Sequence, residues 1–370
     1  MNKPRRGPNL REAVLEDYEQ ISMLEDKYDL EPKSRKEWEH IWVSNPTYKD
    51  VGKQWPIGWV LEDEDRRIVG YLGNIPLWYE FRGHKLVAAV THAWVVESPY
   101  RSYAILLLDS YFRQKNADLF LSTTLNAQGT EAFRVFKSPA VPVGRWDQSA
   151  FWITHYQGFV SSWIRKKSVR MKILILPFSA ALWVQDVLTR RPSTCDRNVA
   201  KVEPVESFDR RFDIFWGALK ERYPQLLLAD RSGEVLEWHF RFAIQKKDAW
   251  ILTIADGSEL SAYSIFCRQD KPSLGLKRMR FVDFQALDGN SSLLPMLSWA
   301  LQRCRAEGID MLECIGICPQ QNEVFESLAS RQRKLPSWMY FYKARDLSLA
   351  QNLEHPQVWN PSWFDGDGTL

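Results

Sequence analysis

The pattern of hydrophobic and polar positions changes period several times along the first 160 residues. Residues 10–14 are a short, partly apolar run that predicts a strand, and apolar residues then recur at helical spacing over 18–28. Ser34 and Glu37 form a capping box that predicts a second helix, to residue 43. Three strands, a helix, a strand and a helix follow, over residues 58–62, 68–79, 85–96, 102–116, 119–124 and 128–136. This order predicts a mixed sheet covered by helices.

The second part of the chain repeats this order without evident residue identity. Helical periodicity covers residues 208–223 and 233–242. A later helix is expected to end at Gly308, because glycine is common just past the end of a helix. The elements after the first two helices are expected at residues 249–255, 260–267, 276–286, 291–307, 311–315, 320–330 and 338–343. Two copies of one fold are the simplest explanation.

We therefore predict an α/β (α+β) protein with two tandem domains, each a mixed, mainly antiparallel sheet flanked by helices. The expected division is an N-terminal domain at 8–160, a linker with an apolar helix at 161–204, a C-terminal domain at 205–346 and a C-terminal tail at 347–370.

The composition is that of a folded globular chain. Hydrophobic residues make up 45% and charged residues 26% of the 370, which is near the globular average. The net charge of +3 lacks the concentrated basic excess that contacts to a phosphate backbone require, so we expect no nucleic acid partner. The 17 Trp, 13 Tyr and 19 Phe enlarge a core, and such side chains also line grooves for flat or amphipathic ligands.

Cysteines and histidines give no spacing typical of a metal site. The five cysteines are Cys195, Cys267, Cys304, Cys314 and Cys318, and no pair forms Cys-x-x-Cys. We expect buried free thiols and no metal. The segment Asp365-Gly366-Asp367 has part of a calcium-loop pattern without its other ligands, which favours a packed tail. Because the sequence MNKPRRGPNLRE has no apolar signal segment, we expect a cytoplasmic protein.

An apolar segment, residues 173–184, lies between a basic cluster at 165–172 and Arg190-Arg191. It is too short to span a bilayer, which needs about 20 residues. One interpretation is an interfacial helix that makes peripheral membrane contact through residues 165–191, held by the basic flanks. The other is a connecting helix packed between two domains, which Pro177 within the segment favours.

A strand, a turn and a helix around Arg101 carry the candidate chemistry. The strand ends at Val96, and a Leu-rich helix is expected from Ser102 onward. The first N–H groups of a helix have no partner within it, and they attract anions, most often phosphate. Arg101 would add a charge-assisted hydrogen bond.

These residues resemble the GNAT superfamily of acyl-coenzyme A dependent N-acyltransferases. The matching features are the N-terminal strand and helix, Ile68-Val69-Gly70-Tyr71-Leu72-Gly73, the strand ending in Val96, Pro99-Tyr100-Arg101, and the stretch Asn-Ala-Gln-Gly-Thr-Glu-Ala-Phe that begins at Asn126. The resemblance covers residues 8–157 by motif and 205–345 by element order alone. The tandem arrangement is similar to that of Fem-type aminoacyl transferases and exopolysaccharide-associated acyltransferases.

The resemblance implies acetyl-CoA or a longer acyl-CoA as co-substrate. The pyrophosphate loop of the family maps onto Arg101, Ala104 and Leu106, where the family has glycine at the second position and glycine or alanine at the third. Leu106 would close the phosphate cradle unless it is turned into the sheet as core. The residues expected at the co-substrate are Trp94, Val95, Val96, Arg101, Ser102, Tyr103, Ala104, Ile105, Leu106 and Asn126.

Proton transfer has three candidates near this loop, His92, Glu97 and Tyr103. His92 shares a strand face with Trp94, near where a thioester would lie if the resemblance holds. The alternatives are a hydrogen-bonded structural histidine and, for Glu97, a solvated carboxylate at a turn. The tyrosine that acts as general acid in the family falls on Phe133, which has no proton to donate.

The leading hypothesis is an acyltransferase that passes an acyl group from acyl-CoA to an amine or hydroxyl of an unidentified acceptor. The alternative is a catalytically inactive tandem GNAT-like protein that binds a carbohydrate, lipid or protein partner. A third hypothesis, a Fem-like transferase that uses aminoacyl-tRNA, gains little support from the charge of +3.

Overall fold

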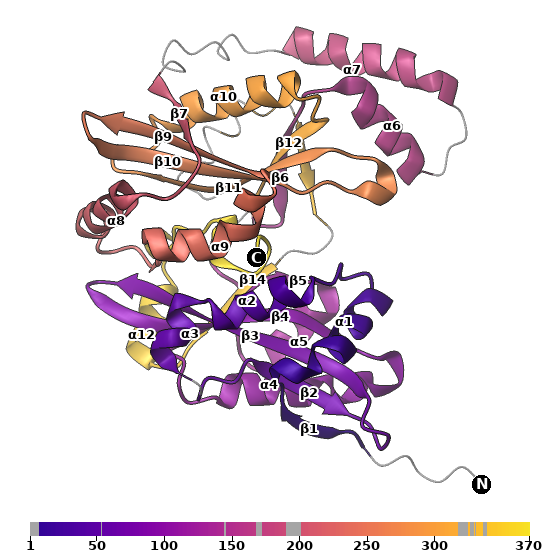
Figure 1. The fold of residues 1–370 in the computed structure, drawn as a ribbon, viewed down its shortest axis with the longest axis vertical. Helices are drawn as coiled ribbons and strands as arrows, with labels where there is room; N and C mark the ends of the chain where they lie inside the picture. The colour runs from indigo at the N-terminus through magenta and orange to yellow at the C-terminus, as the bar shows by residue number, and fades with distance from the viewer. Residues whose placement is uncertain are drawn as a thin grey trace.

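The computed structural model describes residues 7–52, 54–143, 146–167, 172–189, 201–316, 325, 329, 331–335 and 339–370. Two mixed sheets lie one above the other, and helices cover their faces (Figure 1). The expected α/β class with two helix-flanked sheets is confirmed.

The first sheet has the strand order β1-β2-β3-β4-β5-β14, and β8 pairs with β3. Its strands are β1 (Asn9–Glu12), β2 (Gly58–Glu62), β3 (Ile68–Phe81), β4 (His84–Val96), β5 (Leu119–Leu125), β8 (Leu228–Ala229) and β14 (Met339–Ala344). All these pairs are antiparallel except β4 with β5.

The second sheet has the strand order β13-β6-β12-β11-β10-β9-β7. Its strands are β6 (Gln148–Ile153), β7 (Glu203–Val205), β9 (Ala249–Asp256), β10 (Glu259–Arg268), β11 (Arg278–Ala286), β12 (Met311–Ile315) and β13 (Arg331–Lys334). Only β11 and β12 run parallel among these pairs.

Each sheet is completed by a strand from the other half of the chain. Strand β6 lies within the expected first domain, 8–160, and pairs with β12 and β13 of the second sheet. Strand β14 lies within the expected second domain, 205–346, and pairs with β5 of the first sheet. The expected division does not contain this exchange. The periodicity predicts a strand at 338–343 but none at 148–153, and it identifies a strand without identifying its partner.

Helices form the outer layers and a layer that the two sheets share. On the first sheet, α4 (Ala104–Arg113) and α5 (Ala127–Val135) pack on one face, and α10 (Leu293–Ala306) packs on the outer face of the second sheet. The layer between the sheets contains α1 (Tyr18–Lys27), α2 (Arg35–Val43), α8 (Arg210–Arg222) and α9 (Gly233–Gln245). The remaining helices of this core are α3 (Pro46–Val51) and α12 (Leu347–Leu353).

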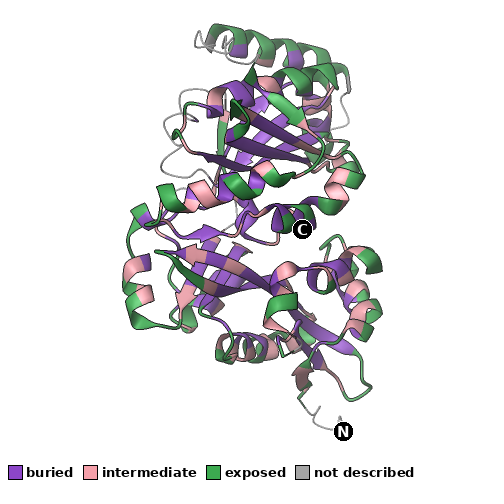
Figure 2. Ribbon diagram, turned by 60° about the vertical axis from the view of Figure 1, so that its left-hand side comes forward, coloured by how far each residue is buried: buried purple, intermediate pink, exposed green. Residues whose placement is uncertain are grey.

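The shared layer joins the two halves through one continuous core. Trp38 and Trp42 of α2 belong to the same buried cluster as Trp238 of α9 and Tyr263 of β10. Trp238 Nε1 donates to the carbonyl of His40 at 3.0 Å, and His40 Nε2 lies 2.9 Å from the carbonyl of Trp238. Burial on this scale makes the halves a single packed body (Figure 2).

The apolar segment forms a helical hairpin with the helix before it, α6 (Tyr156–Lys166) followed by α7 (Ile175–Thr189). Both helices lie at the outer end of the second sheet, far from the first sheet (Figure 1). The interpretation of a helix packed between two domains is therefore wrong. Arg170, Arg190 and Arg191 lie outside the described residues.

Cys267 and Cys304 are buried free thiols, as expected, and Cys314 is also buried. Burial raises the pKa of the Cys304 thiol to about 12. Cys195 and Cys318 lie outside the described residues. Within the described ranges, no helix is long and apolar enough to cross a membrane, and no cluster of metal-ligating side chains occurs.

Candidate functional site

Strands β4 and β5 pair over three residues and then diverge. The parallel pairing runs from Ala88–Leu119 to Val90–Leu121, whereas β4 continues to Val96 and β5 to Leu125. A cleft of about 420 Å³, here called the β4–β5 cleft, opens at the diverging ends. Its lining residues are Tyr28, Leu30, Trp94, Val95, Val96, Arg101, Ser102, Ala104, Ile105, Asn126, Gln128, Gly129 and Ala132.

A bulge in β4 helps to separate the two strands. The register with β3 shifts so that Ala93 and Trp94 together oppose Leu72. Ala93 has a φ of 46°, in the left-handed region that residues with a Cβ seldom adopt. A bulge takes one residue out of the ladder and increases the local twist, which turns the end of β4 away from β5.

All but two of the residues expected at the co-substrate line this cleft. The exceptions are Tyr103 and Leu106. The Tyr103 ring lies against Gly7, where an added Cβ would be 3.0 Å from Cε1 of the ring. Leu106 is 36% exposed and does not line the cleft, so it neither closes the cleft nor is buried in the core.

The turn after β4 differs from the expected free helix N-terminus. A 3₁₀-helix, Ser98–Tyr103, precedes α4. Its i→i+3 bonds occupy backbone amides: Tyr100 N–H donates to the Glu97 carbonyl at 2.8 Å, and Ala104 N–H donates to the Arg101 carbonyl. The expectation that amides just past Arg101 are free is therefore not met at Ala104. The exposed Arg101 side chain at the rim remains as a cation for an anionic ligand.

Glu97, Tyr103 and His92, the three candidates for proton transfer, do not line the β4–β5 cleft. His92 lines a second cavity that is described below. The Glu97 carboxylate instead accepts from Lys27 Nζ at 2.6 Å. The neighbouring Ser98 N–H donates to the Tyr28 hydroxyl at 3.0 Å. These contacts fasten the turn to the end of α1.

A larger cavity of about 700 Å³, here called the chamber, lies between the two halves of the chain. The first half contributes residues of α1, β4 and β5, and the second half contributes β10, β11 and the C-terminal tail. Leu30, Trp94 and Asn126 line both the chamber and the β4–β5 cleft, so the two cavities meet at these residues.

His92 lies on the chamber wall and is paired with a carboxylate from the tail. Its Nδ1 is 3.1 Å from Asp367 Oδ2, and Thr124 Oγ1 donates to the other carboxylate oxygen at 3.4 Å. Trp42 packs edge-on against the imidazole with 6.2 Å between ring centroids. Buried packing and the carboxylate together fix the orientation of the imidazole.

Glu25 of α1 presents a second carboxylate to the chamber. The side chain is 4% exposed, and its Oε1 has no hydrogen-bond partner among the described residues. Burial raises the pKa of the Glu25 carboxyl, although the neighbouring charges of His92 and Lys33 favour its ionised form. Lys33 also lines the chamber, donates to the Leu370 carbonyl and has a pKa lowered by burial.

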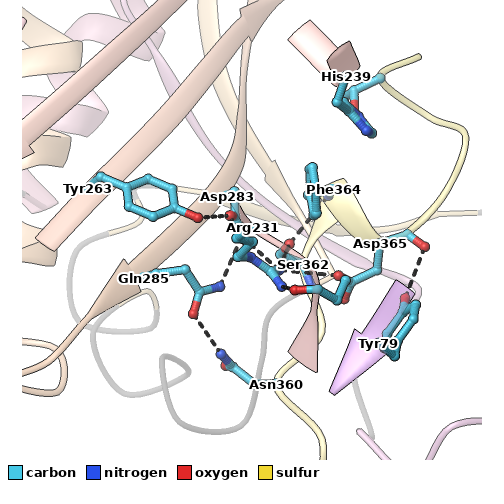
Figure 3. A network of polar contacts seen from close by, with 12 residues as sticks. Tyr79, Arg231, His239, Tyr263, Asp283, Gln285, Asn360, Ser362, Phe364 and Asp365 are labelled. Carbon is cyan, nitrogen blue, oxygen red and sulfur yellow. Dashed lines mark hydrogen bonds and ion pairs between the residues drawn. The ribbon is translucent and has the colours of Figure 1, made fainter. Parts of the chain in front are cut away.

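A buried polar network anchors the tail that carries Asp367 (Figure 3). Arg231 Nε donates to Asp283 of β11 at 2.9 Å, and its Nη2 donates to Asp365 of the tail at 3.2 Å. Tyr263 donates to Asp283 at 2.9 Å, and Ser362 N–H donates to Asp365 at 2.9 Å. Every member of this set is buried or half-buried, so the network holds the tail in one position.

Sequence reasoning did not assign Glu25 or Asp367 to the site. Glu25 carries a weak signal, because it lies four residues after the buried Ile21 and so occupies the core-facing side of its helix. Asp367 and His92 are 275 residues apart, and nothing local in the sequence pairs them. Phe133, at the position of the family tyrosine, is fully buried with its ring 6.3 Å from Trp94.

The sequence matches no family model and no curated protein. The structure is similar to Saccharomyces cerevisiae N-myristoyltransferase with bound myristoyl-CoA, with a TM-score of 0.57 and 9% identity over 93% of this chain and 80% of that one. It is also similar to a probable N-acyltransferase from Enterococcus faecalis V583, with a TM-score of 0.54 and 11% identity over 92% of this chain and 73% of that one. A GCN5-related N-acetyltransferase from Anabaena variabilis ATCC 29413 gives a TM-score of 0.50 and 12% identity over 92% and 73%.

Proposed function

We propose that this chain, which has the GNAT fold, is an N-acyltransferase that moves an acyl group from acyl-CoA to an amine of an unidentified acceptor. The observation that carries the proposal is the junction at Leu30, Trp94 and Asn126. There a cleft between splayed strands opens into a chamber that contains a paired histidine. A donor and an acceptor bound on the two sides of such a junction would meet in one place.

The β4–β5 cleft fits the arm of an acyl-CoA. Trp94, Val95 and Val96 give it an apolar wall, and Arg101 at the rim offers a charge for a phosphate. Gly129 of α5 keeps it open, since a Cβ there would lie 3.4 Å from the Trp94 ring and 3.0 Å from Leu125 Cδ2. The similar yeast N-myristoyltransferase has myristoyl-CoA bound, which supports the same class of donor for this cleft.

His92 is the proposed general base. If Nδ1–H donates to Asp367, the ring is held in the tautomer whose Nε2 carries the lone pair. Nε2 makes no hydrogen bond to any described residue. Glu25, as a carboxylate, would attract the ammonium form of the acceptor amine into the chamber. The ammonium gives one proton to water before the attack, so that the neutral amine is the nucleophile.

The transfer step is a displacement at the thioester carbonyl. The acceptor nitrogen forms the new bond to the acyl carbon, the carbon–sulfur bond breaks with its electron pair on sulfur, and the amine proton passes to His92. The leaving thiolate must take its proton from water or from His92, because Phe133 cannot donate one.

The test compares His92→Gln and Asp367→Asn with His155→Gln. His155 is the matched control, because its Nδ1 is 3.0 Å from Asp310 Oδ1 in a histidine–aspartate pair outside both cavities. Thiol release from acetyl-CoA and myristoyl-CoA is measured with a panel of primary amines. We expect His92→Gln to lower kcat/KM by about 10²- to 10⁴-fold, the range for general base catalysis. Asp367→Asn should have a smaller effect, and the control should have none.

Equal rates for His92→Gln and His155→Gln would refute the role of His92. The second candidate is an inactive binding protein, because the buried Phe133 cannot donate a proton at the position of the family tyrosine. Binding of acyl-CoA without thiol release by wild type or any variant would support this candidate.

A further inference from the structure

The two walls of the chamber carry opposite charge. Glu25 and Asp367 lie on the side of His92, here called the acidic wall, together with one cation, Lys33. The second sheet and the loop between β10 and β11 contribute the other, basic wall, whose cations are Arg268, Lys271, Arg278 and Arg280. This wall also contains Asp270, which pairs with Arg268 at 3.0 Å. Both walls line the same 700 Å³ space.

Positive charge on the basic wall exceeds the negative charge next to it. Arg278 and Arg280 alternate along β11 and therefore share a face. Their guanidinium groups lie 3.2 and 3.4 Å from Glu313, a fully buried carboxylate that also pairs with Arg333. Three guanidinium groups thus share one carboxylate.

The titration of Arg280 reflects this excess. Burial and repulsion from Arg278 lower its pKa to about 9, in spite of the attraction of Glu313. A further anion beside these side chains would offset the repulsion and raise this pKa again.

We propose that the acceptor is an amine that carries an acidic group, a carboxylate or a phosphate. Its amine lies toward the acidic wall, where His92 takes the proton, and its acid is bound by the basic wall. This inference rests on the proposed acyl transfer, because it names the class of acceptor for the same chamber.

The test uses matched amines and measures binding directly. Ligand-observed NMR titrations compare β-alanine with propylamine, and phosphoethanolamine with ethanolamine, on the full chain. We expect the acid-bearing member of at least one pair to bind about tenfold tighter, and the pair that shows it distinguishes carboxylate from phosphate. Equal affinity within both pairs would overturn the proposal.

Variants locate the binding. Lys271→Gln and Arg280→Gln should reduce the preference for the acid, and Arg280→Lys should restore part of it. Lys277→Gln is the control, because this exposed lysine adjoins β11 and does not line the chamber. An unchanged preference in folded Lys271→Gln and Arg280→Gln would also overturn the proposal. A parallel titration with acyl-CoA separates the two claims: if acyl-CoA binds while the preference is absent, only the acceptor class is refuted.

A second, independent observation concerns the α6–α7 hairpin. This hairpin exposes many large apolar side chains to solvent. Leu188 is 80% exposed and Leu176 is 67% exposed. The exposed set is Trp163, Ile173, Leu176, Phe178, Trp183, Val184, Val187 and Leu188. Figure 2 shows this hairpin as an exposed layer at the end of the molecule.

Among the described residues of the hairpin, the exposed charged side chains are all basic. Asp186 is the one charged residue of α7, and it is turned inward to Arg331 at 2.8 Å and Tyr156 at 3.0 Å. Arg165, Lys166 and Lys167 are exposed at the end of α6. An uncharged apolar face beside basic side chains is complementary to a bilayer surface with anionic headgroups.

We infer that the α6–α7 hairpin lies on an anionic membrane surface. Co-sedimentation with lipid vesicles tests this inference. One set of vesicles contains phosphatidylcholine alone, and the other contains phosphatidylcholine with about 30% of the anionic lipid phosphatidylglycerol. Binding should rise with anionic lipid and fall with salt.

Leu188→Asp should weaken binding at least about tenfold. Its matched control is Leu347→Asp, because Leu347 is also 80% exposed and lies on α12, away from the hairpin. Binding that is absent, or equally reduced by both variants, would contradict the inference. A dimer that Leu188→Asp dissociates in the absence of lipid would show instead that a second copy of the chain covers this face.

Discussion

The imidazole of His239 is buried between Phe240 and Phe364, with ring centroids 4.6 and 4.5 Å away. Nδ1 has no hydrogen-bond partner among the described residues, and Nε2 lies 2.7 Å from the Thr369 hydroxyl. Burial lowers the pKa of His239 from 6.5 to about 3. The tail beside the chamber is thus packed against a histidine whose neutral form burial favours.

This histidine makes stability depend on pH. A base whose pKa is lower in the folded state contributes stability that is fully present above 6.5 and is lost as the pH falls from 6.5 toward 3. We expect the free energy of unfolding to decrease by roughly 1.4 kcal/mol per pH unit in this window on account of His239. Urea unfolding of His239→Gln between pH 4 and 7 should show a shallower slope. His84→Gln, at the exposed first residue of β4, is the control. Parallel slopes for wild type and His239→Gln would exclude this role.

Single residues of the site differ in how far the sequence could predict them. Arg101, Trp94 and Asn126 were predictable, because a strand end, a turn and a helix start leave a local pattern and match the resemblance. Asp367 was not predictable, because only folding brings the tail to His92. The one sign of Glu25 in the sequence was its position on the apolar, core-facing side of a helix, where a carboxylate is unusual.

Helix α8 contains a glycine that packing does not require. A Cβ on Gly217 would meet no atom within 4 Å. Gly217→Ala should therefore stabilise the protein by about 0.5–1 kcal/mol, since alanine loses less backbone entropy in a helix. Urea unfolding measures the change in the free energy of unfolding. A lower stability of Gly217→Ala would show that the space beside α8 is not open.

The tail contains a glycine that packing does require. A Cβ on Gly366 would overlap Thr123 Oγ1 of β5. We expect Gly366→Ala to destabilise the protein by about 1–3 kcal/mol, as overpacking does, and to lower acyl transfer by displacing Asp367. If Gly366→Ala kept full stability and full activity, the tail would be able to shift without disturbing Asp367, and the prediction would be wrong.

At the scale of elements, the periodicity predicted most strands and helices within a few residues. Strands β2 and β12 have the expected bounds, and the capping box at Ser34 begins α2. The exchange of β6 and β14 between the sheets could not be predicted, because pairing depends on contacts far apart in sequence. The helix expected at 320–330 falls largely outside the described residues.

At the scale of the whole molecule, the site exists only because the two halves share a core. The first half supplies the cleft and His92, the second supplies the basic wall, and the tail crosses between them to place Asp367. The C-terminal end lies between the two sheets in Figure 1. The repeated order of elements indicated two copies of one fold, yet it did not indicate that the copies build one chamber.

The proposed acyl transfer depends most directly on the β4–β5 cleft as the donor site. Isothermal titration of acyl-CoA into wild type, Arg101→Ala and Arg113→Ala tests it, where Arg113 is a control on α4 whose guanidinium pairs with Asp109 outside the cleft. We predict one bound acyl-CoA per chain, about tenfold weaker binding in Arg101→Ala because a charge-assisted contact to phosphate is lost, and no change in Arg113→Ala. No binding at millimolar acyl-CoA, or equal affinity in all three proteins, would contradict the account.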